Sequence, residues 1–305
     1  MTLLHWTIPL PAGYRREDVL AFHARDTQAV AEQITPTGLR KGIVQGGPAV
    51  LLEVAFDDTQ AICRAEIDGD EAPGLREQLH GALLNMLGLR IDPAPFARLA
   101  ASDVLLAPLV LRNPGLRIVQ SASPFEALTW AIIGQQINLS FAIALRRTFI
   151  EQGGRRHSSG LWCYPEAADV AQLHIDDLTS RKFSRAKAET VLRLAQLVDG
   201  GQLSLELPAS GEVDAISQAL LAVKGIGPWT VNYALLRGYG YADCSLHGDV
   251  AIRAALQKLL GEEVKPDMVR TEQWLRQYRP HRTMLAAHLW ASLHAAEKNS
   301  PPQRE

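Results

Sequence analysis

The segment at residues 220–230, LLAVKGIGPWT, constrains the fold more than any other, because it places two glycines around one apolar residue. A helix that ends here can put Gly225 in the left-handed conformation at its C-terminus, and Pro228 is a favoured first residue for the next helix. Such a tight turn packs Ile226 between the two helices and directs the free N–H groups of the second helix toward a phosphate. The same pattern also occurs in an ordinary turn between helices, so other motifs in the sequence are needed to distinguish a phosphate-binding hairpin from such a turn.

The chain changes character near residues 92–95, DPAP, where two prolines mark a boundary. Before them, period-two alternation and two helical segments predict a small α+β domain. The predicted strands there are 4–10, 39–45, 50–56 and 61–67, and the predicted helices are 18–30 and 74–88. After the prolines the pattern is almost wholly helical. The predicted helices of this part are 95–101, 104–112, 124–134, 140–152, 165–173, 185–199, 213–223, 228–239, 249–260, 268–278 and 281–296.

Composition and charge are those of an ordinary globular protein, with 47% hydrophobic and 21% charged residues. No apolar stretch is long enough to cross a bilayer, and residues 1–10 lack the charged head of a signal peptide, so we expect a cytoplasmic protein without a membrane partner. The three cysteines lie far apart in the sequence and predict neither disulfides nor a zinc or iron–sulfur site. A net charge of −2 means that binding to nucleic acid would have to rely on local groups of arginine and lysine.

Further motifs surround the hairpin in a fixed order. They are FEAL at 125–128, IGQQ at 133–136, NY at 232–233, LRG at 236–238, and Asp249 after CSLHG at 244–248. Together they resemble the 3-methyladenine DNA glycosylase II (AlkA-like) family of the helix-hairpin-helix-GPD superfamily, over residues 95–296. The resemblance implies a base-excision-repair DNA glycosylase that flips an alkylated base, such as 3-methyladenine or 7-methylguanine, out of duplex DNA and hydrolyses its N-glycosidic bond.

The fold that the resemblance implies is mostly α, a helix-hairpin-helix DNA glycosylase fold of two helical subdomains with a small N-terminal α+β domain of the TATA-box-like type. We expect the N-terminal domain at residues 1–92. One helical subdomain would comprise 93–120 and 234–305, and the other would be 121–233, ending in the helix-hairpin-helix. The implied enzyme requires no cofactor, binds double-stranded DNA that contains a damaged base, and acts as a monomer.

Asp249 is the predicted catalytic residue. Hydrolysis of an N-glycosidic bond passes through a sugar with oxocarbenium character, which a carboxylate beside C1′ stabilises while it orients or deprotonates water. The start of the predicted helix 249–260 suits a charged carboxylate because of the helix dipole. From position alone a helix N-cap would be the more common explanation, and the match to the family's catalytic aspartate reverses that preference. Asp243, the nearest alternative, is interpreted as a loop residue.

Three aromatic residues are predicted to line the base pocket. Trp229 and Tyr233 are four residues apart and therefore share one helix face, and Trp290 lies on the last long helix. Aromatic faces can hold a flipped base, and they attract it more strongly when methylation has made it cationic. Taken individually, each would be interpreted as a core residue, but all three match pocket positions of the family. Trp130 and Trp274 are interpreted as core residues.

By the same resemblance the hairpin binds the DNA backbone, and a monovalent cation can bridge its carbonyl groups to a phosphate. The predicted phosphate-binding residues are Lys224, Gly225, Ile226, Gly227 and Thr230. The predicted cation ligands are the backbone carbonyl groups of Leu221, Val223 and Ile226. The lyase branch of the superfamily has a lysine where this chain has Trp229, and Lys224 precedes the turn, so we expect hydrolysis without strand cleavage.

Base flipping leaves a gap in the duplex, and Gln135 and Gln136 fall in the family's wedge loop, which fills it. The best-known form of the family has leucine where this chain has Gln136. A glutamine can fill the gap and hydrogen-bond the orphaned base, but these two residues are explained equally well as polar links between a helix and a loop.

Two other functions stay open from the sequence. A helix-hairpin-helix protein that binds DNA without catalysis would use the three aromatic residues for packing, and the presence of Asp249 argues against it. A glycosylase for oxidised or deaminated purines is the other alternative, because the sequence does not determine which base the pocket accepts.

Overall fold

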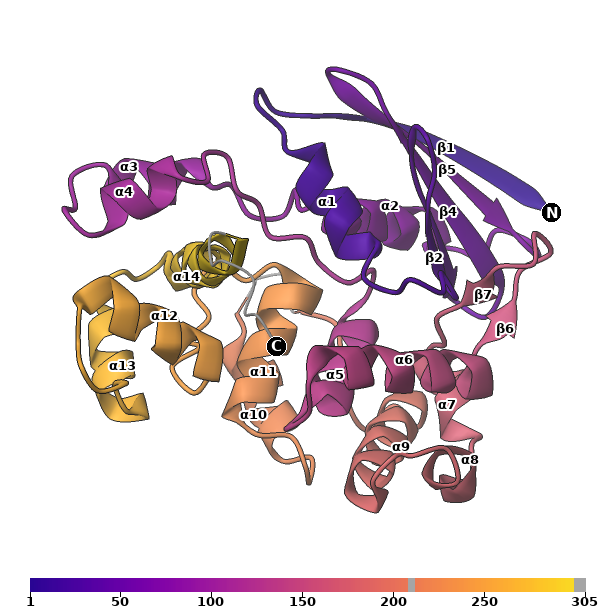
Figure 1. Cartoon of the computed structure of the whole chain (residues 1–305). Coiled ribbons are helices and arrows are strands. Elements are labelled where there is room, and N and C mark those ends of the chain that lie inside the picture. Colours follow the sequence, from indigo (N-terminus) through magenta and orange to yellow (C-terminus); the bar gives the residue numbers. More distant parts are fainter. Residues whose placement is uncertain (208–211, 299–305) are drawn as a thin grey trace, which may run out of the picture. The chain divides into compact units, whose positions relative to one another are not determined.

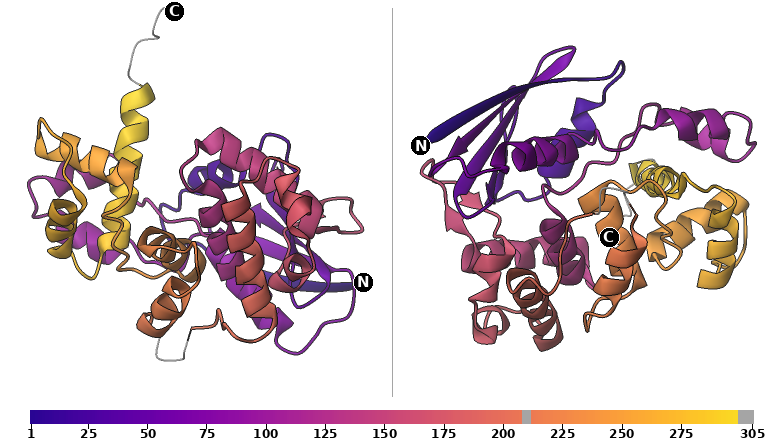
Figure 2. Two further views of the ribbon diagram at one scale, coloured as in Figure 1. Left: turned by 90° about the horizontal axis from the view of Figure 1, so that it is seen from below. Right: turned by 180° about the vertical axis from the view of Figure 1, so that it is seen from behind.

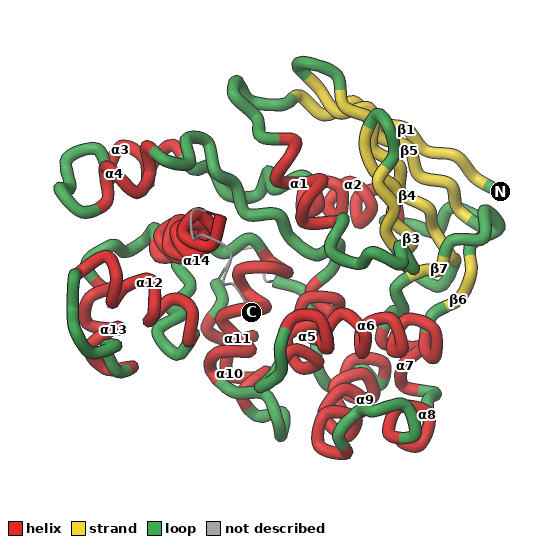
Figure 3. Tube along the Cα trace, viewed as in Figure 1, coloured by secondary structure: helices red, strands yellow, loops and turns green. Residues whose placement is uncertain are grey.

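The computed structural model describes residues 1–207 and 212–298, which form two compact units (Figure 1). The units are Met1–Gly88 with Val119–Tyr239, and Leu89–Ile118 with Gly240–Glu305. Helices predominate, and the strands of the described residues all belong to the first unit (Figure 3). No described helix is long and apolar enough to span a bilayer. The predicted three-part division stays a prediction, and its residues 208–211 and 299–305 lie outside the described part.

The N-terminal sheet of the first unit has five antiparallel strands in the order β1-β5-β4-β3-β2. The strands are β1 Thr2–Pro9, β2 Glu32–Ile34, β3 Gly38–Val44, β4 Ala49–Phe56 and β5 Gln60–Ile67. In β4, which has a partner on each side, Val50, Leu51 and Leu52 have no exposed surface. Helices α1 (Arg16–His23) and α2 (Leu75–Met86) lie beside the sheet on the same side (Figure 2). These two helices cover one face of the sheet, and the apolar run of β4 is buried along its length.

Helix α1 is shorter than the pattern predicts. The expected helix covers 18–30, whereas a turn replaces its second half. The carboxylate of Asp26 accepts hydrogen bonds from the backbone N–H groups of Gln28 and Val30, at 3.1 and 3.4 Å, and Ala29 has a φ of 50°. An aspartate that binds the backbone in this way stabilises a turn at the expense of a helix. The turn leads into β2, a strand that the sequence pattern did not predict.

The rest of the first unit is helical and is tied to the sheet by a small hairpin. Its elements are α5 Pro124–Gly134, α6 Leu139–Gly153, β6 Arg155–Arg156, β7 Trp162–Cys163, α7 Ala167–Ala171, α8 Ile175–Thr179, α9 Arg185–Asp199, α10 Asp214–Leu221, α11 Pro228–Ala234 and the π-helical turn η1 Leu235–Tyr239. After β7, the N–H of Tyr164 donates to the carbonyl of Gly42 at 2.9 Å, and its carbonyl accepts from Val44 at 2.8 Å. These bonds attach the helical part to β3.

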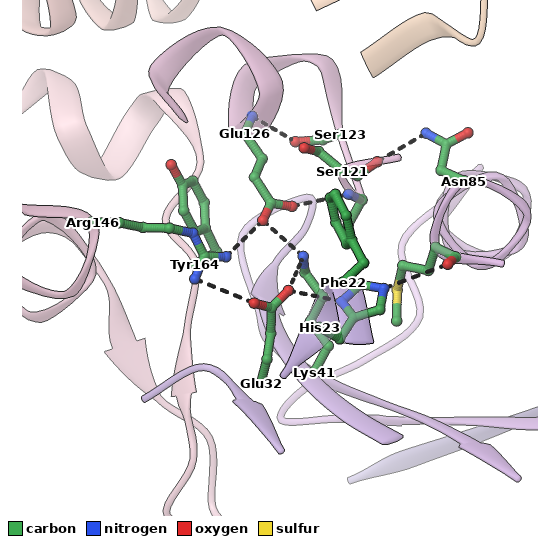
Figure 4. Close-up of polar contacts among 12 residues, drawn as sticks. Phe22, His23, Glu32, Lys41, Asn85, Ser121, Ser123, Glu126, Arg146 and Tyr164 are labelled. Carbon is green, nitrogen blue, oxygen red and sulfur yellow. Dashed lines mark hydrogen bonds and ion pairs between the residues drawn. The ribbon is translucent and has the colours of Figure 1, made fainter. Parts of the chain in front are cut away.

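A cluster of buried charged side chains joins the sheet to the helices inside the first unit (Figure 4). Lys41 on β3 has no exposed surface, and its Nζ lies 2.8 Å from Glu32 on β2 and 2.7 Å from Glu126 on α5. Arg146 on α6 lies 2.9 Å from Glu126 and 3.3 Å from Glu32. Burial alone would raise the pKa of each carboxyl group, but Arg146 and Lys41 outweigh it, so both pKa values lie below the ordinary value.

The helix predicted over 228–239 divides into α11 and η1. At Gly238 the backbone passes so close to α5 that an added Cβ would lie 2.8 Å from Cα of Pro124. The side-chain amides of Asn85 and Gln120 donate hydrogen bonds, at 3.3 and 3.2 Å, to two carbonyl groups of η1. Close packing on α5, with these donors for the displaced carbonyls, explains the departure from a regular helix.

The second unit combines a segment from the middle of the chain with its C-terminal helices. Its elements are α3 Ala94–Ala100, α4 Leu106–Leu111, α12 Val250–Leu260, α13 Met268–Arg276 and α14 Arg282–Lys298. The rings of Phe96 on α3 and His288 on α14 lie 5.5 Å apart. The hydroxyl of Tyr278, after α13, donates to Asp103 at 3.1 Å. Segments far apart in the sequence therefore share the core of this unit.

Candidate active site

The predicted hairpin is present between α10 and α11. Gly225 in the turn has a φ of 97°, a conformation that favours glycine. It also lies against α9, because an added Cβ would overlap Oγ1 of Thr190 and lie 2.8 Å from its Cγ2. Gly227 is the N-cap of α11, which begins with a proline, and Ile226 is only 5% exposed. The two glycines therefore have different roles, since only Gly225 requires a residue without a side chain.

The residues predicted to bind phosphate differ in exposure. Lys224 and Gly225 are exposed, Gly227 is half-buried, and Thr230 is buried. The hydroxyl of Thr230 accepts a hydrogen bond from the side-chain amide of Gln135 at 3.0 Å, which links it to the end of α5. The backbone N–H of Thr230 belongs to the first turn of α11, where N–H groups have no partner within the helix.

Gln135 and Gln136, predicted for the wedge loop, have different surroundings. The side-chain amide of Gln135 also donates to the carbonyl of Gly225 at 3.2 Å, and so links the end of α5 to the hairpin. This is the polar link that the sequence left open as an alternative. Gln136 is exposed and has a φ of 55°, which is uncommon for a residue with a side chain. The loop presents Gln136 to solvent, and its insertion into DNA stays a prediction.

An aromatic surface in the first unit is formed by Trp130, Trp229 and Tyr233. The ring centroids of Trp229 and Tyr233 on α11 lie 5.2 Å apart, with planes inclined by 31°. Nε1 of Trp130 on α5 donates a hydrogen bond to the hydroxyl of Tyr233 at 3.0 Å, and all three residues are half-buried. The sequence interpretation placed Trp130 in the core. Only the packing of α5 against α11 brings it to Tyr233, and no periodicity along the chain could have indicated this.

In the second unit, Asp249 and Trp290 are in contact. Asp249 is the N-cap of α12, and its Oδ1 accepts a hydrogen bond from the backbone N–H of Ile252 at 2.9 Å. The same oxygen accepts a hydrogen bond from Nε1 of Trp290 at 3.3 Å. Both side chains are half-buried. Asp249 is therefore an N-cap in the structure, and the same two donors fix the direction of its carboxylate.

Asp243, the alternative to Asp249, is engaged by two arginines. Its carboxylate lies 2.7 Å from Nε of Arg282 and 3.0 Å from Nε of Arg279. Burial would raise the pKa of Asp243, but the hydrogen bonds from these arginines outweigh it and hold the pKa below its ordinary value. Asp243 lies in a loop, as the sequence interpretation has it, and its bonds are structural.

Metal-binding side chains are not grouped in the part of the chain that the structure describes, where no set of three or more histidine, cysteine, aspartate or glutamate residues could hold an ion. Cys63, Cys163 and Cys244 are free and buried. Burial raises the pKa of Cys163 to about 11, so its thiol stays protonated at neutral pH. The three cysteines therefore pack as small apolar residues.

The fold defines a class of protein. The structure named 3-methyladenine DNA-glycosylase from Archaeoglobus fulgidus matches with a TM-score of 0.78 and 22% identity, over 94% of this chain and 97% of that one. The 8-oxoguanine glycosylase/lyase of Clostridium acetobutylicum, in complex with DNA, matches with a TM-score of 0.69 and 16% identity, over 98% and 99% of the two chains. This chain has the helix-hairpin-helix-GPD glycosylase fold, which confirms the predicted fold class.

Sequence comparison then identifies the family. The DNA-3-methyladenine glycosylase of Bacillus subtilis is 29% identical over 265 residues, which are 85% of this chain and 87% of that protein. YfjP of the same organism, provisionally named for the same activity, is 31% identical over 193 residues, 63% of this chain and 67% of YfjP. DNA-3-methyladenine glycosylase 2 of Escherichia coli is 28% identical over 180 residues, 58% and 61% of the two chains. No protein-family model matches the chain. The chain belongs to the DNA-3-methyladenine glycosylase (AlkA) family of DNA glycosylases.

Proposed function

We propose that the protein removes alkylated bases, such as 3-methyladenine and 7-methylguanine, from double-stranded DNA by flipping the base and hydrolysing its N-glycosidic bond. The observation that carries this proposal is the fixed direction of the Asp249 carboxylate, held by the N–H of Ile252 and by Nε1 of Trp290. A carboxylate held in place needs little reorganisation to stabilise positive charge on the sugar. The relatives named DNA-3-methyladenine glycosylase support the substrate.

Water is the nucleophile in this reaction. The bond between C1′ and the base nitrogen breaks, and both of its electrons go to the base. Asp249 accepts a proton from water while the water oxygen bonds to C1′. A base methylated on a ring nitrogen carries a positive charge and leaves as a neutral molecule, so it needs no acid. Aromatic faces favour such a base through cation–π attraction, and Trp229 with Tyr233 in the first unit and Trp290 in the second each offer such faces.

The reaction ends with base release and leaves the strand intact. A lyase needs an amine that attacks C1′ to form a Schiff base. The first turn of α11 carries Trp229 where the lyase branch has its lysine, and Lys224 lies before the turn of the hairpin. Lys187 on α9 donates instead to the carbonyl of Ile133 at 2.8 Å, so it is engaged in the packing of α5. These positions support simple hydrolysis.

The hairpin and the loop after α5 bind the DNA. The exposed turn at Lys224 and Gly225 contacts phosphates through backbone N–H groups and positive charge, which adds affinity without reading sequence. Gln136, exposed at the tip of its loop, fills the gap left by the flipped base. Partner duplexes therefore need a damaged base but no particular sequence around it.

A monovalent cation at the hairpin fits the groups that are present. Its ligands would be the backbone carbonyls of Leu221, Val223 and Ile226, which are neutral dipoles of the kind that replace the hydration shell of a singly charged ion. Leu221 is the last residue of α10, where carbonyl groups lack partners in the helix. The carbonyl of Val223 accepts the N–H of Ile226 at 3.0 Å and has a second lone pair for an ion. Such an ion would attract a phosphate.

The test is Asp249→Asn, which keeps an oxygen for the N–H of Ile252. We expect release of 7-methylguanine in single turnover to fall by about a hundredfold or more, with DNA affinity and unfolding midpoint close to those of the parent. The matched control is Asp267→Asn, because Asp267 caps α13 in the same way, accepting from the N–H of Arg270 at 2.8 Å. Parent protein that releases no alkylated base overturns the proposal, and near-normal turnover in Asp249→Asn removes Asp249 from the mechanism.

A further inference from the structure

A positive charge from the N-terminal domain lies at the aromatic surface. Arg25 follows α1, and its guanidinium carbon lies 3.7 Å from the centroid of the Phe22 ring. Its Nε donates a hydrogen bond to the carbonyl of Phe22 at 2.8 Å, which fixes the direction of the side chain. Phe22 itself lies beside the buried charge cluster (Figure 4). The predicted helix over 18–30 would have placed Arg25 on a helix, and the turn places it differently.

The same guanidinium reaches the residues that are proposed to hold the base. Its carbon lies 5.4 Å from the ring centroid of Trp130, and Trp130 donates a hydrogen bond to the hydroxyl of Tyr233 at 3.0 Å. Tyr233 in turn packs on Trp229. Trp130 therefore connects the guanidinium of Arg25 to Tyr233, with which its charge interacts. One cation thus lies within reach of the aromatic surface.

This charge is not neutralised by a neighbouring acid. Asp26 lies 3.1 Å from Nε of Arg147, and Glu32 is taken up by Lys41 and Arg146 in the buried cluster. Within residues 1–207 and 212–298, Arg25 forms no ion pair. Burial lowers the pKa of Arg25. Because an arginine pKa starts far above neutral, the group keeps its charge at neutral pH.

A further arginine strengthens the positive field at the same place. Arg237 of η1 lies 5.0 Å from the Phe22 ring, on which Arg25 also rests. A half-buried cation without an ion-pair partner loses part of its solvation in the fold, and such groups are common where a protein acts on a charged substrate. The position of Arg25 is therefore better explained by an interaction with a bound substrate than by a structural role.

We propose that Arg25 is a specificity-determining residue of the base site, where its fixed charge favours the departure of neutral purines and disfavours the binding of cationic ones. This inference rests on the proposed function. When the bond from C1′ to the base nitrogen breaks, both electrons go to the base. A neutral purine then carries a negative charge until water protonates it, and a nearby guanidinium stabilises that charge. A cationic base becomes neutral and gains nothing, and beforehand Arg25 repels it.

Arg25→Gln should therefore have opposite effects on the two kinds of lesion. The assay is single-turnover release, with enzyme in excess, from duplexes that contain either hypoxanthine, which is neutral, or 7-methylguanine, which is cationic. We expect hypoxanthine release to fall by about tenfold or more, and 7-methylguanine release to stay level or rise. Arg25→Lys keeps the charge and changes the shape, so its ratio of the two rates should stay within about threefold of the parent ratio.

The matched control is Arg16→Gln, which removes the same charge from α1 at a side chain that is 54% exposed and pairs with Glu17. Its ratio of rates should equal that of the parent. An unchanged ratio in Arg25→Gln overturns the inference, as does an equal loss on both lesions, which would mark a purely structural residue. A parent that releases 7-methylguanine but no hypoxanthine also overturns it while the proposed function stands. A parent that releases only hypoxanthine refutes the proposed function and, with it, the inference that rests on it.

Discussion

Replacing Gly225 with alanine should destabilise the protein by about 2 to 5 kcal/mol, whereas the same change at Gly227 should be nearly neutral. Two physical terms add at Gly225. Its φ is 97°, where a side chain costs about 1–2 kcal/mol. An added Cβ would also lie 2.8 Å from Cγ2 and 3.0 Å from Cβ of Thr190, and relief of such an overlap costs about 1–3 kcal/mol. Gly227 has a φ of −107°, and a Cβ there would meet no described atom within 4 Å.

The assay is unfolding in urea, followed by far-ultraviolet circular dichroism. The midpoints of the parent, Gly225→Ala and Gly227→Ala are compared, with the same dependence of unfolding free energy on urea concentration for all three. A Thr190→Ala background tests the two terms separately. It removes Oγ1 and Cγ2, the two atoms nearest the new Cβ, and leaves only Cβ at 3.0 Å, so Gly225→Ala should then lose little more than the conformational part, about 1–2 kcal/mol. Equal unfolding midpoints for the two glycine variants would refute the reasoning, and so would the same loss with and without Thr190.

Four other outcomes follow from the structure. Lys41→Met should lower the free energy of unfolding by about 3–5 kcal/mol, because Glu32 and Glu126 would stay buried without their lysine; a loss below about 1 kcal/mol would contradict this. The folded state lowers the pKa values of both carboxyl groups, so their ionised forms stabilise it at any pH above the ordinary carboxyl pKa. This contribution disappears as the pH falls through the pKa values of the folded state. The free energy of unfolding of the parent should therefore decline on acidification below about pH 5 and should not decline on a rise to pH 8. Trp290→Ala should slow release of cationic lesions more than that of neutral ones in single turnover, and equal losses would exclude cation–π stacking as its role. Gln136→Ala should weaken binding to damaged duplex by about threefold to tenfold, as measured by fluorescence anisotropy, and an unchanged affinity would remove it from the wedge.

Local signals made the hairpin and the helix starts predictable. Gly225 and Pro228 each constrain their own backbone, so the turn follows from a few adjacent residues. The helix over 124–134 begins and ends as expected, because Ser123 accepts a hydrogen bond from the N–H of Glu126 and a proline follows it directly. Asp249 was placed correctly at the start of its helix for the same reason.

Contacts between distant segments could not be predicted from the sequence. Arg25 was assigned to a helix because the predicted helix extends over 18–30, whereas the hydrogen bonds of Asp26 to the following backbone stabilise a turn there. Trp130 reaches Tyr233 only through the packing of two helices, across a separation that periodicity does not cover. The charge cluster of Lys41 combines side chains from β3, β2 and α5. Charged residues are usually exposed, so their spacing in the sequence does not indicate that these ones are buried.

The buried cluster around Lys41 connects the two sides of the boundary that the prolines near residue 93 mark in the sequence. The prolines divide the composition of the chain, yet Lys41 and Glu32 lie before them, and Glu126 and Arg146 lie after them. A cut at the prolines would break the ion pairs of Lys41 with Glu126 and of Arg146 with Glu32, although each side would keep one pair, Lys41 with Glu32 and Arg146 with Glu126. Recombination between relatives faces the same constraint. Chimeric genes should tolerate a crossover at these prolines only when both parents carry the same four charges, and gene fusions or permuted chains should keep β2, β3, α5 and α6 from one source.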